Sequence, residues 1–138
     1  MYQPDPIAMK FERATRLYHS IAYTESLRPA QWQVLRFFAN APADQRTLSG
    51  CAHARATTMG TTSVTVTALV DRGFLERTGS NRNVGLRLTE KGRHYIEHSD
   101  PAKYLFHAVA NLPSSKRQAL DDALAEIIEH LEGADKSE

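Results

Sequence analysis

The sequence has a single cysteine, Cys51, and no long apolar run. One cysteine cannot form an internal disulfide, so a reducing compartment, the cytoplasm, is the expected location. No apolar stretch approaches the roughly 20 residues that a membrane-spanning helix needs. The first residues also lack the charged-then-apolar order of a signal peptide. We therefore expect a cytoplasmic protein that has no contact with a membrane.

The composition predicts a globular domain with an uneven charge. A chain of 138 residues, 41% hydrophobic and 24% charged, is long enough for one domain with its own core. Residues 46–93 hold eight Lys or Arg against three Asp or Glu, whereas residues 94–138 hold four against nine. The net charges are therefore +5 and −5. A basic middle segment is typical of a surface that neutralises phosphates, although charges can also gather by chance on a solvated face.

The middle of the chain reads as a helix, a hairpin and the start of another helix. We predict a helix over residues 61–72 and strands over 74–77 and 84–88. The turn between the strands contains Gly, Ser and Asn, which are common in tight turns. Thr89 can cap the helix that follows. A helix followed by a hairpin with a basic tip is a shape that can read DNA, because the helix fits a major groove and the tip reaches phosphates or a minor groove.

The first of these helices has an ambiguous pattern. In Ser63–Thr67, valines alternate with hydroxyl-bearing residues, and most of these residues are β-branched, which favours a strand. Four side chains nevertheless recur at helical spacing and form one inner face: Thr62, Val66, Leu69 and Val70. We therefore predict a helix whose other side carries Thr61, Ser63, Val64 and Thr67. Their hydroxyl and methyl groups can contact base edges and phosphates, unless the helix packs inside the protein.

The predicted DNA contacts come from the start and outer side of this helix and from the hairpin tip. Arg82 is the best single candidate, either in the minor groove or on a phosphate. The full set is Thr58, Gly60, Thr61, Thr62, Ser63, Val64, Thr67, Asn81, Arg82 and Asn83.

Three stretches resemble the winged-helix core of the MarR family of bacterial transcriptional regulators: LRPAQWQVL, GTTSVTVTALVDRGFLER and NRNVGLRLTEKG. The resemblance covers roughly residues 27–93. It implies a mainly α winged helix-turn-helix fold with a small β-hairpin, and a homodimeric DNA-binding regulator that commonly acts as a repressor. The sequence departs from the family where Val64 replaces a frequent arginine. The hairpin tip keeps one of the family's two arginines and lacks its acidic residues. At the start of the helix, Gly60 takes the position where the family usually has a serine cap.

We expect a single domain over residues 1–138, with the winged-helix core at 28–93. Helices at 5–24 and 101–133 flank this core and carry apolar stripes that it leaves uncovered. A second copy would bury those stripes, as the family resemblance also implies. Such a dimer places two reading helices about one DNA turn, ~34 Å, apart and predicts an inverted-repeat operator.

The ends of these flanking helices have recognisable signals. Asp5 and Asp100 each precede a proline, which is the cap-then-proline pattern of a helix start. Gly133 is the predicted end of the last helix.

Two functions other than operator binding fit parts of the sequence. The missing arginine and acidic residues leave open a winged-helix module that binds protein without specific DNA binding. His94, Glu97 and His98 spell H-x-x-E-H, the inverted zinc-peptidase pattern. Such an enzyme needs a third ligand and a substrate cleft, so we interpret these histidines as solvated surface residues and expect no enzyme activity, metal or cofactor.

Two smaller sites complete the predictions. The family resemblance implies a small, commonly aromatic effector, and Tyr18, His19 and Trp32 either line its cleft or belong to the ordinary core. Cys51 falls where the family usually has a leucine, so we interpret it as a small buried hydrophobic residue rather than a redox sensor.

Overall fold

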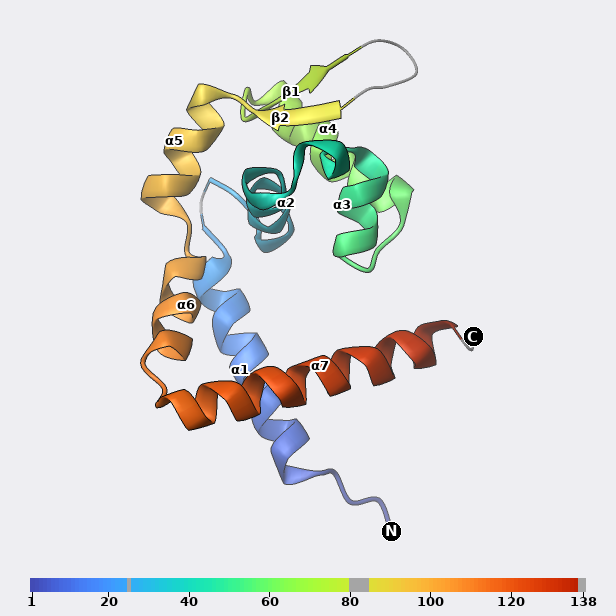
Figure 1. The fold of residues 1–138 in the computed structure, drawn as a ribbon, viewed down its shortest axis with the longest axis vertical. Helices are drawn as coiled ribbons and strands as arrows, with labels where there is room; N and C mark the ends of the chain where they lie inside the picture. The colour runs from blue at the N-terminus through green and yellow to red at the C-terminus, as the bar shows by residue number, and fades with distance from the viewer. Residues whose placement is uncertain (25, 80–84, 137–138) are drawn as a thin grey trace. The chain divides into compact units, whose positions relative to one another are not determined.

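The computed structural model describes residues 1–24, 26–79 and 85–136. The chain forms two compact units, Met1–Pro101 and Ala102–Glu138. The described part is mainly α-helical with one two-stranded hairpin, as the sequence predicts (Figure 1). The first unit contains α1 (Pro6–Ala22), α2 (Pro29–Asn40), the 3-10 turn η1 (Ala43–Gln45), α3 (Leu48–Ala54), α4 (Met59–Asp71), β1 (Leu75–Thr78), β2 (Gly85–Leu88) and α5 (Glu90–Ser99). The second contains α6 (Ala102–Ala110) and α7 (Ser114–Lys136).

The core of the first unit is built around α2. Trp32 and Leu35 are fully buried, and the Trp32 ring stacks on Tyr95 of α5 with centroids 5.3 Å apart. Helix α4 and the two strands close the core from other sides (Figure 1). The core cluster contains Leu27, Trp32, Val34, Leu35, Phe38, Cys51, Val66, Leu69, Phe74, Leu75, Leu86 and Leu88.

Side-chain caps fix the helix starts. Asp5 and Thr89 cap α1 and α5, as predicted, by accepting backbone N–H bonds from the first turn. The predicted cap of α4 was wrong by two residues. The Thr58 hydroxyl accepts from the backbone N–H of Thr61, and Gly60 lies inside the first turn. Gly60 has no side-chain oxygen, so the threonine hydroxyl satisfies the free N–H instead.

The hairpin is held against the helices at its base. The strands pair antiparallel with Leu75 opposite Leu88 and Arg77 opposite Leu86. Gly92 of α5 lies so close to β1 that an added Cβ would come within 2.2 Å of the Phe74 carbonyl oxygen. The Thr89 hydroxyl also donates to the Gly73 carbonyl oxygen at 2.5 Å. These contacts set the direction in which the hairpin leaves the core.

A nearly buried ionic network joins three segments of the first unit. Nη1 of Arg36 on α2 lies 2.5 Å from Oδ1 of Asp100, and the side chains are 17% and 12% exposed. Nη2 of the same arginine donates to the Tyr18 hydroxyl of α1 at 3.1 Å. The network fixes α1 and the end of α5 to α2, since breaking a nearly buried ion pair leaves a charge uncompensated.

The second unit departs from the sequence prediction at its end. Helix α7 does not stop at Gly133 but continues to Lys136. Glycine ends a helix where it adopts a left-handed φ, and in the described chain Gly73 and Gly79 adopt one whereas Gly133 does not.

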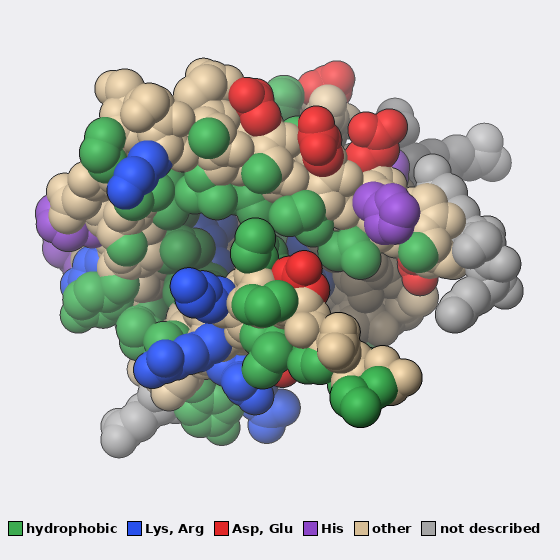
Figure 2. Space-filling model, turned by 90° about the horizontal axis from the view of Figure 1, so that it is seen from below, with side chains coloured by type: hydrophobic (Ala, Val, Ile, Leu, Met, Phe, Trp, Pro, Cys, Tyr) green, Lys and Arg blue, Asp and Glu red, His purple; other side chains and the backbone are tan. Residues whose placement is uncertain are grey.

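The flanking helices expose apolar side chains. Figure 2 shows one face of the molecule, on which many hydrophobic side chains lie open at the surface. Among the described residues, no helix is both long and apolar enough to cross a membrane. The exposed set on α1, α6 and α7 is Ile7, Met9, Phe11, Leu17, Ile21, Tyr104, Leu105, Phe106, Ile127, Ile128 and Leu131.

Candidate nucleic-acid interface

Helices α3 and α4 form a helix-turn-helix. Thr47 caps α3 by accepting from the backbone N–H of Gly50 at 3.0 Å, and Thr58 caps α4. The turn between them passes through Ala56 with a φ of 51°, in the left-handed region that residues with a side chain rarely adopt. After this turn α4 packs against both α3 and α2.

The inner face of α4 is locked into the core. Thr62 and Leu69 are fully buried and Val66 is 3% exposed, so the predicted inner face is confirmed. Thr62 is also among the predicted DNA contacts, and its side chain is buried in this structure. Its side chain lies one helical turn from Val66 on the buried side and offers no surface to a ligand.

The outer face of α4 carries the remaining predicted residues. Gly60, Thr61, Val64 and Thr67 are exposed, and Ser63 is half-buried. Val64 is 73% exposed. Thr58 is exposed too, but its hydroxyl is engaged with the backbone N–H and the hydroxyl of Thr61. The helix therefore presents small side chains outward while its inner face holds it in place.

The hairpin adds a basic side chain that the sequence prediction missed. Arg77 lies opposite Leu86, so both side chains emerge on the face of the hairpin that packs toward α4. The Arg77 side chain is exposed, and no acidic group lies within ion-pair distance of it among the described residues. The alternation along the two strands could have identified it. The predicted tip residues Asn81, Arg82 and Asn83 lie outside the described residues.

A small cavity separates α4 from the hairpin. It has a volume of about 180 Å³. Its lining combines three apolar side chains with two hydroxyl groups and one arginine: Leu48, Ser63, Val66, Thr67, Arg77 and Leu86. An arginine together with two hydroxyls and an apolar lining suits a small ligand with one flat apolar part and one anionic group.

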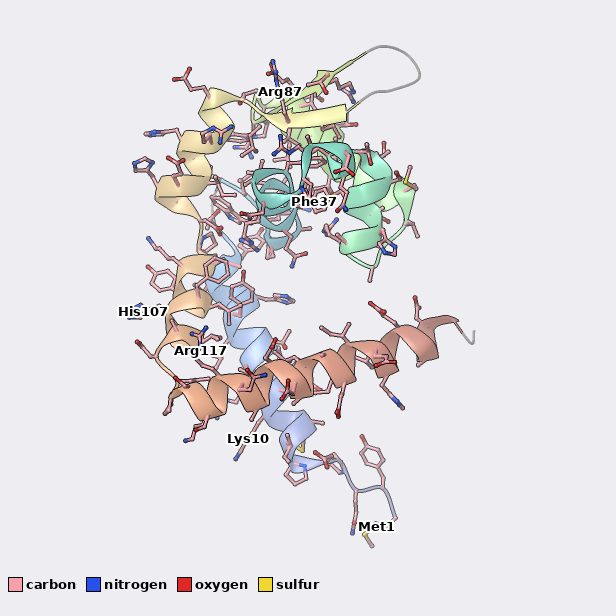
Figure 3. The ribbon with its side chains drawn as sticks, viewed as in Figure 1. Met1, Lys10, Phe37, Arg87, His107 and Arg117 are labelled. Atoms are coloured by element: carbon pink, nitrogen blue, oxygen red, sulfur yellow. The ribbon has the colours of Figure 1, made fainter. Side chains whose placement is uncertain are left out.

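Several other cations of the basic segment have structural partners. The Arg72 guanidinium donates to the Ser26 carbonyl and lies 5.1 Å from the centre of the Phe74 ring. Lys91 donates to the Arg72 carbonyl at 2.8 Å. Arg87 (Figure 3) pairs across the hairpin with Glu76, with Nε and Oε1 2.5 Å apart. The basic charge is therefore divided between stabilising the base of the hairpin and facing solvent.

Arg55 is a half-buried cation behind the interface. Its Nε and Nη1 atoms are buried without a hydrogen-bond partner among the described residues, and Nη2 lies 3.5 Å from Oε1 of Gln33. Cys51, one turn earlier, is fully buried, as predicted. Burial raises the pKa of the Cys51 thiol, and the Arg55 charge offsets part of that rise. A buried thiol with a raised pKa is poorly suited to redox sensing.

Two of the residues considered for an effector cleft have structural roles. Trp32 is buried in the core, and the Tyr18 hydroxyl accepts a hydrogen bond from Arg36. His94 and His98 lie on one face of α5 with ring centroids 4.2 Å apart, and both are exposed. Within the described residues, no group of three or more His, Cys, Asp or Glu side chains could hold a metal ion.

Comparison with known proteins identifies the fold. No protein-family model matches the sequence, and no curated protein matches it. A MarR family transcriptional regulator from Silicibacter pomeroyi is 26% identical, with 90% of this chain and 86% of that chain covered and a TM-score of 0.70. Staphylococcus aureus MepR, solved in complex with DNA, is 15% identical over 93% and 99% of the two chains, with a TM-score of 0.77.

A third structure, Staphylococcus aureus MarR in complex with salicylate and kanamycin, is 23% identical, covers 90% and 86% of the two chains and has a TM-score of 0.68. All three likenesses extend over about nine-tenths of this chain, beyond the stretch in which the sequence itself resembles the family. The chain therefore has the winged helix-turn-helix fold of the MarR family of transcriptional regulators, which are DNA-binding proteins and not enzymes.

Proposed function

We propose that this protein is a cytoplasmic transcriptional repressor that binds double-stranded DNA as a homodimer and places α4 in the major groove. The observation that carries the proposal is the two-sided character of α4. Thr62, Val66 and Leu69 anchor its inner face, while Gly60, Val64 and Thr67 form an exposed row of small groups. A rigidly held helix with an open, small-residue face can approach base edges closely.

Charge supports the same orientation. The first ten residues of α4 contain no acidic side chain, and the positive end of the helix dipole lies at their start. The exposed Arg77 on β1 lines the same cavity as Ser63 and Thr67 of this helix. We propose that Arg77 binds a DNA phosphate and that Arg82, which follows β1 in the sequence, extends this contact along the backbone.

The homodimer rests on the exposed apolar side chains of the flanking helices. Residues such as Phe11 on α1, Phe106 on α6 and Leu131 on α7 are 48%, 60% and 60% exposed. Exposed apolar side chains of this kind favour association, and a second copy would cover them with two-fold symmetry. A two-fold dimer reads an inverted repeat, and an occupied operator blocks transcription.

The cavity between α4 and the hairpin is the proposed effector site. Salicylate is bound in the related structure of Staphylococcus aureus MarR, and a small aromatic carboxylate suits a cavity lined by apolar side chains and Arg77. A ligand there would contact both DNA-reading elements. It releases DNA if it binds the free protein more tightly than the DNA-bound protein.

Binding to DNA tests the main proposal. Genomic fragments selected by the wild-type protein are titrated by fluorescence anisotropy at several salt concentrations, together with Arg77→Gln. Lys116→Gln on α7 is the matched control, because it removes one exposed positive charge outside the interface. We expect steep salt dependence whose slope falls by about 1 in the Arg77 variant and not in the control. Affinity no higher than for random DNA would contradict the proposal and favour a module that binds protein.

Calorimetry with salicylate tests the effector site. Ser63→Leu fills the cavity and should abolish binding. Tyr18→Phe leaves the cavity unchanged and should retain it. The reverse pattern would return the site to the cleft first predicted around Tyr18.

A further inference from the structure

The outer face of α4 lacks every side chain that forms paired hydrogen bonds with a base. Met59–Val70 contains no Arg, Lys, Asn, Gln, Asp or Glu. Guanine is usually recognised by Arg or Lys, and adenine by Asn or Gln, through two hydrogen bonds in the major groove. If α4 selects a sequence, it must do so through hydroxyl or methyl groups.

Exposed apolar groups gather on this helix. Within residues 28–79 and 85–101, the large hydrophobic side chains that the structure exposes are Met59 and Val64, at 48% and 73%. The other large apolar side chains of residues 28–79 and 85–101 are buried or half-buried. Both exceptions therefore lie on the element that the proposed function places against DNA.

Val64 is the most prominent apolar group of the exposed row. Its neighbour one turn earlier is Gly60, and no other side chain or segment among the described residues lies within 4 Å of the position that a Cβ would take there. Helical side chains lean toward the N-terminus, so the Val64 isopropyl group stands over this open position. Thr67, one turn later on the same face, offers a second methyl group.

We infer that Val64, assisted by Thr67, selects thymine by contact with its 5-methyl group. The inference rests on the proposed function and names what its reading helix recognises. Thymine is the one standard DNA base with a methyl group in the major groove, and apolar side chains are its usual partners. The helix therefore discriminates against uracil and cytosine at the facing position, and 5-methylcytosine regains part of the lost contact.

The test exchanges single methyl groups on both partners. A duplex selected by the wild-type protein is resynthesised with deoxyuridine in place of each half-site thymidine in turn. Affinities are measured for the wild type and for Val64→Ala, with Thr65→Ala as the matched control, because Thr65 is half-buried on the same helix and lies outside the exposed row. Removing one methyl contact should weaken wild-type binding about fourfold, which corresponds to about 0.8 kcal/mol per buried methylene-sized group. Val64→Ala should lose that sensitivity at one position, whereas the control keeps it.

The outcomes separate this inference from the proposed function. Specific, salt-dependent binding that is indifferent to deoxyuridine at every position would overturn the inference and leave the DNA-binding function standing. A deoxyuridine effect of unchanged size in Val64→Ala would also overturn the role of Val64. Failure to bind any selected duplex would overturn both. Thermal unfolding shows that the variants are folded, which we expect because Val64 is exposed.

Discussion

A methyl group added at Gly60 should make the protein more stable and a weaker DNA binder. Gly60 is the second residue of α4, and an added Cβ would meet no atom of the described chain within 4 Å. Gly60→Ala therefore introduces no clash in the free protein. It removes backbone freedom from the unfolded state, which stabilises a helix.

The two effects can be estimated separately. Replacing glycine by alanine in a helix is worth roughly 0.5–1 kcal/mol, and we expect the lower end because Gly60 lies in the first turn. That gain corresponds to an increase in Tm of roughly 1–4 °C. On DNA, the new methyl group occupies space between the helix backbone and the groove. Overpacking of a close contact costs about 1–3 kcal/mol, which is roughly a 5- to 150-fold loss of affinity.

Gly133→Ala is the matched control. Gly133 is also helical, and its Cβ position is also open, but it lies on α7. Both variants should raise the Tm, and Gly60→Ala alone should raise the Kd for the selected duplex in fluorescence anisotropy. Equal DNA affinity of the two variants would refute the close approach of α4 to the groove. A fall in Tm for Gly60→Ala would refute the open space around that residue.

Three further variants and one reaction test the structure. Arg77→Leu should lower affinity for all duplexes by a similar factor in anisotropy titrations, because a phosphate contact carries no sequence information; a change in sequence preference would contradict this. Arg55→Leu should raise the free energy of unfolding in urea by about 1–3 kcal/mol, because two buried nitrogens have no hydrogen-bond partner among the described residues; a lower free energy of unfolding would show that they have partners. Gly92→Ala should lower the free energy of unfolding by about 1–3 kcal/mol or more, because the added Cβ would overlap the Phe74 carbonyl; an unchanged urea midpoint would refute that close approach. The raised pKa of Cys51 should make thiol labelling at neutral pH slow until urea unfolds the chain; fast labelling of folded protein would contradict this. The contribution of the protonated thiol to folding stability is present below the ordinary thiol pKa. It is lost as the pH rises through the raised pKa of the folded state.

Local patterns predicted much of the fold. Asp5 and Thr89 cap their helices as the sequence indicates, because capping depends on residues within one turn. The buried side of α4 followed from the spacing of Thr62, Val66 and Leu69, although its β-branched residues favour a strand. Tertiary packing of that face outweighs the local preference.

The features that the sequence did not reveal depend on contacts between distant residues. The ion pair of Arg36 with Asp100 joins residues 64 positions apart, and no local pattern indicates it. Arg72 and Lys91 count as basic charge in the sequence, but the fold uses both at the base of the hairpin. Arg77 is the converse: the alternation along the strands indicates which face of the hairpin it lies on, but its position beside α4 depends on the fold.

The predicted ends of two helices were wrong for related reasons. Gly60 and Gly133 both suggest a helix boundary, yet each lies inside a helix with an ordinary helical backbone. Glycine permits a boundary without imposing one. The neighbouring residues decide, as the Thr58 hydroxyl does at the start of α4.

The most direct test of the account is a cross-link between α4 and DNA. Thr67→Cys and, as the control, Glu126→Cys on α7 are each labelled with a photoactivatable thiol reagent; both positions are exposed. Cys51 is fully buried with a raised pKa and should stay unlabelled in the folded protein. The account predicts cross-links from position 67 to bases within each half-site of the bound duplex, and none from position 126. Cross-links from position 126, or none from position 67 on a duplex that is demonstrably bound, would contradict the placement of α4 in the major groove.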